Sequence, residues 1–244
     1  MHGSTYVVRI AAIYDVHGNL PALEAVLGAL EDAKPDLVVV GGDVVPGPRP
    51  AEVVERVTSL GDRLRAIRGN GERETLEAGD EESRWVRERL TPAERSTLAG
   101  WPATSRIEVG DRSVLFCHAT PGDDTTIFTP RTPEVRLRRL VGSSGADIVV
   151  CGHTHIQFEH RAGDTTILNA GSVGMPYEDR PGAYWLLLDE AGHEFRRTPY
   201  DVAAALDSME PLGYPGAWFI ESLREQPGRE EALEEFERRA RASE

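Results

Sequence analysis

The stretch "VVRIAAIYDVHGNLPALEAVLGAL", residues 7–30, passes from an apolar run through a short polar loop into a helix-like pattern. The run is rich in Val and Ile and ends at Asp15, which predicts a buried strand. Asn19 suits a helix N-cap, Pro21 suits a first helical turn, and leucines follow at helical spacing on one face. We therefore expect a strand, a polar loop and a helix in this order.

The same order recurs along the first half of the chain. "DLVVVGGD", residues 36–43, runs from a strand into a loop, residues 51–60 are helix-like, and "LRAIRGN", residues 64–70, repeats the strand and loop. Strands that alternate with helices predict an α/β fold with a parallel section of sheet. Residues 72–98 are charged and helix-prone, which indicates a solvated helical cover.

The second half of the chain is β-rich. Its strand-like segments are "RIEVGDRSVLFCH" (106–118), "ADIVVCGH" (146–153), "FEHRAGDTTILNAGS" (158–172) and "AYWLLLDEAGHEFRRTPY" (183–200). Gly-Asp and Ala-Gly pairs inside three of them predict hairpins. We expect two packed sheets with helices outside, formed by one domain over residues 1–200. Residues 201–244 predict a helical extension whose Leu206, Met209, Trp218 and Phe219 pack on that domain.

Composition limits the possible partners. The formal net charge of -14 argues against bulk nucleic acid as a partner. The chain has no apolar run of about 18 residues and no signal-like start, so we expect a soluble cytoplasmic protein with no membrane partner. Cys117 and Cys151 each end a strand-like run, which favours buried free thiols over a disulfide.

Polar residues follow each strand that enters a sharp loop. They are Asp15, His17, Asp43, Asn70, His118, His153 and His155. The carboxyl ends of strands are the ligand-binding edge of α/β sheets, so these side chains are expected to converge. In "CGHTHIQ", residues 151–157, Gly152 permits the turn that would bring both histidines to one point.

The residue types of this set indicate metal ions. Imidazole nitrogens and carboxylate and amide oxygens, without cysteine, suit ions such as Mn, Fe, Zn or Ni. Seven ligands are too many for one tetrahedral ion, and they suit two ions about 3.5 to 4 Å apart. Two such close cations need a bridging anion, for which Asp43 is the candidate.

The order D-x-H, G-D, G-N, a lone His and G-H-x-H over residues 15–155 resembles the calcineurin-like metallophosphoesterase superfamily. The resemblance is greatest to its small prokaryotic phosphodiesterase branch, and it extends from residue 8 to residue 188, including "LNAGSVGMP" at 168–176. It implies a four-layer αββα sandwich of two mixed β-sheets flanked by helices. Residues 1–200 would then be the metallophosphoesterase domain.

The resemblance also implies two divalent metal ions, with Mn as first choice and Fe, Zn, Ni or Mg as alternatives. One ion would take Asp15, His17, Asp43 and His155, and the other would take Asp43, Asn70, His118 and His153. The expected catalytic residues are Asp43, Asn70 and His118. A metal-bridging hydroxide would attack phosphorus in line.

One position departs from the family pattern. Gly71 follows Asn70 where the family usually has a histidine that protonates the leaving group, a contribution of about 10²- to 10⁴-fold. We therefore expect a diesterase that acts on small phosphoesters or nucleotides, and we expect Gly71→His to raise monoester turnover. A phosphomonoesterase, a dinucleoside polyphosphate hydrolase and a non-catalytic protein-interaction scaffold are the alternatives.

The loop after His118 is the expected substrate loop. Thr120 and Asp124 in "HATPGDDTTIF", residues 118–128, are candidate substrate-binding residues. Arg131 is a candidate hydrogen-bond donor to a phosphate of the substrate. From the habit of the family we also expect a homodimer.

Overall fold

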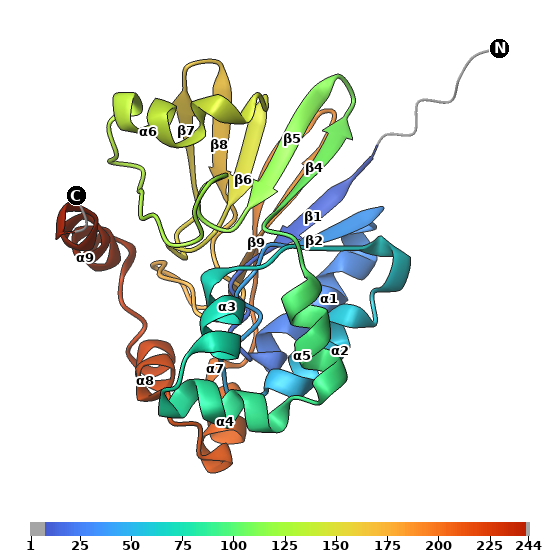
Figure 1. Ribbon diagram of the computed structural model, residues 1–244, viewed down its shortest axis with the longest axis vertical. Helices are drawn as coiled ribbons and strands as arrows, with labels where there is room; N and C mark the ends of the chain where they lie inside the picture. The colour runs from blue at the N-terminus through green and yellow to red at the C-terminus, as the bar shows by residue number, and fades with distance from the viewer. Residues whose placement is uncertain (1–7, 243–244) are drawn as a thin grey trace.

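Two mixed five-stranded sheets face each other in the computed structural model, which describes residues 8–242 (Figure 1). Val7 of the first strand-like run and the last two residues of the expected extension lie outside the described residues. The first sheet has the strand order β10 (Gly192–Thr198), β9 (Ala183–Asp189), β1 (Ile10–Ile13), β2 (Leu37–Val40), β3 (Leu64–Ala66). The second has the order β4 (Thr104–Val109), β5 (Arg112–Cys117), β6 (Ile148–Cys151), β8 (Thr165–Asn169), β7 (Phe158–Ala162).

Each sheet has a parallel centre and antiparallel edges. β1 pairs in parallel with β2, and β2 with β3, while β9 and β10 form an antiparallel hairpin that joins β1. β5, β6 and β8 are parallel, with β4 and β7 antiparallel at the two edges. The three expected hairpins are therefore confirmed. Because the central strands run in parallel, their carboxyl ends meet at one edge of each sheet.

The hydrophobic core lies in three layers, which explains why the central strands are apolar without alternation. On β1, Ile10 and Ala12 face the second sheet, and Ala11 and Ile13 face the helices that cover the first sheet. Leu137 of α6 belongs to a third cluster, which covers the outer face of the second sheet. The order helix, sheet, sheet, helix confirms the expected four-layer sandwich.

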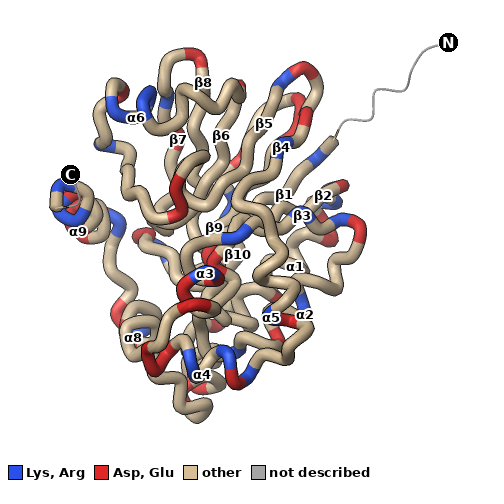
Figure 2. The backbone as a smooth tube through the Cα atoms, viewed as in Figure 1, with Lys and Arg blue, Asp and Glu red and all other residues tan. Residues whose placement is uncertain are grey.

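Helices cover the outer face of the first sheet. They are α1 (Leu20–Ala33), α2 (Pro50–Thr58), α3 (Asn70–Glu77), α4 (Glu81–Arg89) and α5 (Pro92–Gly100), while α6 (Glu134–Val141) covers the second sheet. Short 3₁₀ turns occupy Gly61–Arg63, Gly142–Ser144 and Glu210–Leu212. Asn19 caps α1 by accepting a hydrogen bond from the Ala22 backbone N–H, as expected. Figure 2 shows acidic and basic residues interleaved along α4, in keeping with a solvated helical cover.

The two cysteines, Cys117 at the end of β5 and Cys151 at the end of β6, are buried and free. Both side chains pack in the cluster under α6. Burial raises the pKa of both thiols, so they remain protonated at neutral pH. The expectation of buried free thiols is confirmed.

The C-terminal helices α7 (Val202–Met209), α8 (Ala217–Glu225) and α9 (Arg229–Ala242) lie against the sandwich. Met209 and Phe219 are fully buried in the cluster above the first sheet, and Leu206 is partly buried against it. Trp218 departs from the expectation, because its side chain remains 39% exposed and does not join the core. The division of the chain into residues 1–200 and 201–244 stays a prediction.

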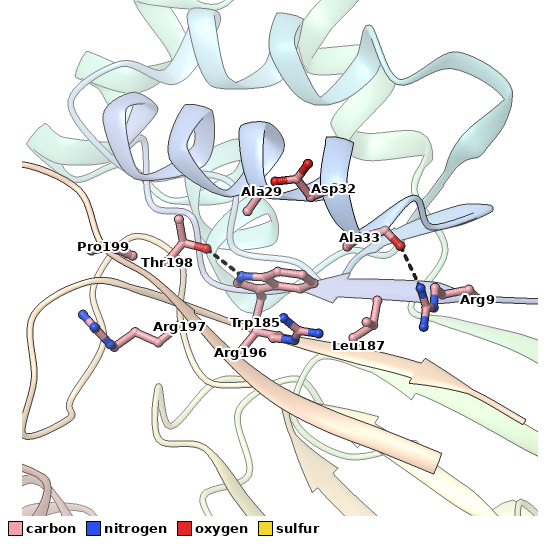
Figure 3. A pocket seen from close by; sticks show the side chains of 10 residues that line it. All are labelled: Arg9, Ala29, Asp32, Ala33, Trp185, Leu187, Arg196, Arg197, Thr198 and Pro199. Atoms are coloured by element: carbon pink, nitrogen blue, oxygen red, sulfur yellow. Dashed lines mark hydrogen bonds between the residues drawn. The ribbon is translucent and has the colours of Figure 1, made fainter. Parts of the chain in front are cut away.

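A cavity of about 380 Å³ opens between α1 and the β9–β10 hairpin (Figure 3). Trp185 and Arg9 are among the residues that line it, and Arg9 donates to the Ala33 carbonyl at the end of α1. None of the predicted site residues lines this cavity. Over residues 8–242, none of the helices has the length and apolar character that crossing a bilayer requires.

Candidate metal centre

The seven predicted ligands come from the carboxyl ends of five strands. Asp15 and His17 follow β1, Asp43 follows β2, Asn70 begins α3 after β3, His118 follows β5, and His153 and His155 follow β6. The carboxyl ends of β1, β2 and β3 in one sheet meet those of β5 and β6 in the other. The sandwich therefore places side chains from both sheets around one point.

The backbone at five of these positions lies in the left-handed region. Among residues 8–242, the non-glycine residues with positive φ are Asp15, His17, Lys34, Asp43, His153, His155 and Gln226. Lys34 and Gln226 are helix C-caps, where this conformation is usual. The other five are predicted ligands. Such a backbone costs of order 1–3 kcal/mol per residue and is concentrated at functional sites.

The sequence suggested that Gly152 makes the turn that orients the histidine pair, but the structure shows otherwise. The left-handed backbone of His153 (φ 68°) and His155 (φ 57°) makes the turn, while Gly152 is not among the glycines with positive φ. A Cβ at position 152 would lie 2.5 Å from Asp15 Oδ2. Glycine is required there because β1 and β6 end so close together.

The two aspartates each direct one oxygen into the centre. Asp15 Oδ2 accepts a hydrogen bond from the His153 backbone N–H (3.0 Å), and Asp43 Oδ1 accepts one from the Gly71 backbone N–H (2.7 Å). Asp15 Oδ1 then lies 3.9 Å from His118 Nε2, and Asp43 Oδ2 lies 3.4 Å from the same atom. Backbone donors thus orient both carboxylates toward the histidines, as they do for carboxylates that bind metals.

Three histidines complete the inner part of the centre. His118 Nδ1 donates to the Gly41 carbonyl (3.0 Å) and His155 Nδ1 donates to the Met175 carbonyl (2.7 Å). Each hydrogen bond leaves Nε2 to face the carboxylates, the orientation usual for a metal-binding histidine. His17 Nε2 lies 3.3 Å from His155 Nε2 and 3.7 Å from Asp43 Oδ2.

Buried polar atoms without partners identify the centre as a site for a ligand. In the described part of the chain, three predicted ligands contribute such atoms, namely Asp15 Oδ1, Asn70 Oδ1 and His118 Nε2, while His17 faces the centre through its Nε2 and also has an unpartnered Nδ1. Two groups of donors have ligand atoms within 4.8 Å of one another: Asp15, His17, His155 and Asp15, Asp43, His118. An unsatisfied buried polar atom costs about 1–3 kcal/mol, which a bound cation would remove. The donor set therefore fits metal ions.

His153 lies at the margin of the centre. The His153 ring is 5.2 Å from the His118 ring, and its Nε2 donates to the Thr125 carbonyl (3.1 Å). Its Nδ1 then keeps a lone pair. Among residues 8–242, His153 does not belong to the two compact groups of histidine and carboxylate donors.

The charges of the centre also favour cations. Burial alone would raise the pKa of Asp43, but the contact with His118 lowers this pKa well below its ordinary value. Burial alone would lower the pKa of His118, but Asp43 and Asp15 raise it to about 10. Burial lowers the pKa of His17 to about 4, and that of His153 to about 4. Asp43 is therefore ionised, His17 and His153 are neutral, and His118 carries a proton that a metal ion would displace.

Glu72 lies beside the centre and was not among the residues predicted from the sequence. Its side chain is fully buried and accepts four backbone N–H bonds, from Asp43 (2.9 Å), Val44 (2.6 Å), Val45 (3.1 Å) and Gly69 (2.8 Å). Four donors fill the acceptor sites of a carboxylate. Burial and the Asp43 carboxylate raise its pKa to about 7. A glutamate three residues after the N-cap position, here Gly69, as in a capping box, was the available signal.

Glu72→Gln is expected to lower metal affinity and hydrolysis by roughly 10- to 100-fold, as does loss of other groups that hold metal ligands in place. The amide has one acceptor oxygen, so backbone N–H groups beside Asp43 lose their partner. Metal content at a fixed free concentration of Mn²⁺ and the rate of diester hydrolysis measure this effect. Glu77→Gln, exposed on the same helix, is the matched control and should behave as wild type. An equal effect of both variants would contradict the assignment.

The structure argues against a rescue by Gly71→His. A Cβ at position 71 would lie 2.2 Å from the Val45 carbonyl oxygen and 2.8 Å from Asp43 Oδ1. Glycine is needed here because the backbone N–H at 71 must reach Asp43. The packing of this loop therefore leaves no room at position 71 for the histidine that the family usually has.

Gly71→Ala and Gly71→His are both expected to destabilise the fold by roughly 1–3 kcal/mol, the usual cost of overpacking. Both should also lower diesterase activity, because the added atoms displace Asp43. Denaturant unfolding and hydrolysis assays measure the two effects. Gly79→Ala, where a Cβ meets nothing within 4 Å, is the control. A gain of monoester turnover in Gly71→His would show that the loop adapts and would restore the earlier expectation.

The predicted substrate residues are placed in different surroundings. A cavity of about 250 Å³ is lined by His118, Thr120, Asp124 and neighbouring loop residues. Asp124 receives two hydrogen bonds from the Arg73 guanidinium, at 2.8 and 2.9 Å. Arg131 pairs with Glu230 of α9 and does not line this cavity. Thr120 and Asp124 are thus beside the centre, and Arg131 is directed toward the C-terminal helix.

Comparison with known proteins agrees with this geometry. The model of the calcineurin-like phosphoesterase superfamily domain matches residues 8–191. The chain belongs to the calcineurin-like phosphoesterase superfamily. It is therefore a phosphoesterase, a hydrolase, and the expected resemblance is confirmed.

Three relatives show the extent of the likeness. Phosphodiesterase YfcE of Escherichia coli K12 is 26% identical over an alignment of 193 residues, which covers 74% of this chain and 88% of YfcE. The uncharacterized protein MJ0912 of Methanocaldococcus jannaschii is 25% identical over 243 residues, covering 88% of this chain and 96% of MJ0912. The crystal structure of a metallophosphoesterase from Sphaerobacter thermophilus has a TM-score of 0.73 and 26% identity, covering 89% of this chain and 98% of that one. The family and the donor groups together indicate divalent metal binding.

Proposed function

We propose that this phosphoesterase uses two divalent metal ions to hydrolyse phosphodiester bonds in small phosphoesters or nucleotides. The observation that carries the proposal is the set of buried donor atoms without partners that converge from both sheets. One ion would bind Asp15, His17, Asp43 and His155. The other would bind Asp43, Asn70, His118 and His153. We propose Mn²⁺ as the ion, because imidazole and oxygen donors without thiolates suit it.

The residues around the ions have distinct tasks. Two divalent ions, when bound, supply an activated water and clamp the attacking and leaving oxygens of an in-line displacement. Asp43 accepts the Gly71 N–H on one oxygen, and its other oxygen would be free to bind metal. His118 and Asn70 would hold the second ion beside the cavity that Thr120 and Asp124 line, which we propose as the place of the substrate.

The preference for diesters rests on position 71. With glycine there, no side chain at this position can donate a proton to the leaving group, so esters with weakly basic leaving groups are favoured. A protein-interaction scaffold would not need metal-binding side chains. All seven are present in this chain, so we propose an enzyme and not a scaffold. The cytoplasmic location and the homodimer stay predictions.

The deciding experiment compares bis(p-nitrophenyl) phosphate with p-nitrophenyl phosphate as substrates. Chelated protein, and protein reloaded with Mn²⁺, are assayed side by side. Metal-dependent turnover that favours the diester is expected. Turnover that survives complete chelation would contradict the metal mechanism, and a preference for the monoester would contradict the assignment of substrate class.

A further inference from the structure

Trp218 of α8 is an exposed aromatic residue beside the metal centre. Among the described residues, Trp218 (39% exposed) and Val135 (68% exposed) are the large hydrophobic side chains that remain exposed. Single exposed apolar residues are common on protein surfaces, so exposure alone carries no conclusion. The position of Trp218 does, because its ring centroid lies 5.9 Å from that of His17, with the rings at 89°.

The Trp218 indole is held in place. Its Nε1 donates to Glu82 Oε1 of α4 at 3.0 Å. Glu82 Oε1 also accepts the hydroxyl of Tyr214, which packs edge-on against Phe219, a buried residue of α8. An indole whose polar end is bonded and whose ring stays open offers a rigid apolar face at low entropic cost.

A second aromatic residue lies on the same side of the centre. Tyr177 stacks on His155, with 5.3 Å between ring centroids and 15° between ring planes. Its other neighbour is Phe236 of α9, at 5.8 Å, so the C-terminal helix covers Tyr177. His17 and His155 are themselves 5.0 Å apart, centroid to centroid. Of the two aromatic residues that touch this pair, Tyr177 is packed and Trp218 is open.

Trp218 is also outside the part of the chain that the superfamily model matches, which ends at residue 191. The cavity on the His118 side is lined by Thr120, Asp123 and Asp124 together with Ala103, Pro121 and Gly122, and no aromatic residue other than His118 lines it. The centre therefore has threonine and aspartate side chains of the family domain on one side and the Trp218 indole of α8 on another. A phosphodiester carries two ester groups. The two sides of the centre offer them different surroundings, and an aromatic ester group suits the Trp218 side.

We propose that Trp218 is a specificity-determining residue that binds an aromatic ring carried by one ester group of the phosphodiester substrate. This inference rests on the proposed function. It names the substrate class as diesters with an aryl or nucleobase group close to phosphorus. Stacking of a base on an aromatic side chain is lost on alanine substitution with about 5- to 150-fold weaker binding.

The test measures inhibition of bis(p-nitrophenyl) phosphate hydrolysis by diphenyl phosphate and by diethyl phosphate in the Mn²⁺-loaded full chain. In Trp218→Ala, the inhibition constant of diphenyl phosphate is expected to rise about tenfold, and that of diethyl phosphate less than about twofold. Trp218→Phe should keep most of the preference for the diphenyl ester. Val135→Ala, at the other exposed apolar side chain, is the matched control and should leave both constants unchanged. The methyl ester of thymidine 5′-phosphate as a third inhibitor separates a nucleobase from a simple aryl ring.

The outcomes separate this inference from the proposed function. If the Mn²⁺-loaded wild type does not turn over the diester, the proposed function fails and this inference fails with it. If turnover is normal but Trp218→Ala weakens both inhibitors equally, or neither, only the assignment of Trp218 is overturned. Circular dichroism and metal content of Trp218→Ala show that the variant is folded and loaded. If it is not, Trp218→Phe and Trp218→Leu are compared instead, and an equal ratio of constants in these two variants overturns the assignment.

Discussion

Asp43→Asn is expected to abolish most phosphodiesterase activity, by on the order of 10³-fold, comparable to loss of a major electrostatic stabiliser of the transition state. Asp43 Oδ2 lies 3.4 Å from His118 Nε2 and 3.7 Å from His17 Nε2, so this one carboxylate is shared by the two halves of the centre. The amide has the same shape and still accepts the Gly71 N–H through its oxygen. It lacks the negative charge that two neighbouring cations need between them.

The fold of Asp43→Asn should remain intact, because no buried volume changes. Circular dichroism is expected to match wild type, while mass spectrometry under native conditions should show fewer than two Mn²⁺ ions per chain. Asp164→Asn, in the exposed turn between β7 and β8, is the matched control and should keep full activity. A wild-type rate of hydrolysis in Asp43→Asn would contradict the two-metal mechanism.

Removal of metal is expected to have the second largest effect, on activity and on stability together. Binding to the native state alone stabilises it by about 4 kcal/mol at a free metal concentration 1,000 times the Kd. For a chain of this size, 1 kcal/mol moves Tm by roughly 2–4 °C, so reloading chelated protein with Mn²⁺ should raise Tm by roughly 10 °C. This stabilisation would come from metal binding to buried atoms of Asp15, Asn70 and His118 that lack hydrogen-bond partners.

Differential scanning fluorimetry over a range of Mn²⁺ concentrations measures this shift. Chelation should also abolish hydrolysis, and Mn²⁺ should restore it. In Asp43→Asn the metal-induced shift should shrink, whereas in Asp164→Asn it should equal that of wild type. A shift of the same size in both variants would mean that the stabilising ions bind elsewhere.

Most of the fold followed from local patterns. The strand over Ile10–Ile13, the helix capped by Asn19 and the hairpins were predictable because each depends on residues close in sequence. The apolar runs without alternation also indicated strands covered on both faces, which the three core clusters explain. Local signals also mark the helix starts within 72–98, since Asp80 caps α4 and a Thr91–Glu94 capping box begins α5.

The centre was predictable in its residue types but not in its orientation. Asp15 and His118 could be expected near each other, since both follow parallel strands, although they belong to different sheets. Which oxygen of Asp15 faces His118 depends on a hydrogen bond from His153, 138 residues away. No local pattern contains that information.

Sequence alone was enough for the strand-loop-helix order, the superfamily and the residue types at the ends of the strands, because periodicity and motif order are local properties of the chain. Only the tertiary structure decided that Glu72 ties four backbone amides together, that Gly71 has no room for a side chain, and that Trp218 stays open beside His17. Each of these depends on the close approach of segments from separate strands and helices. Such distances are set by the packing of the whole sandwich and of α8 against it.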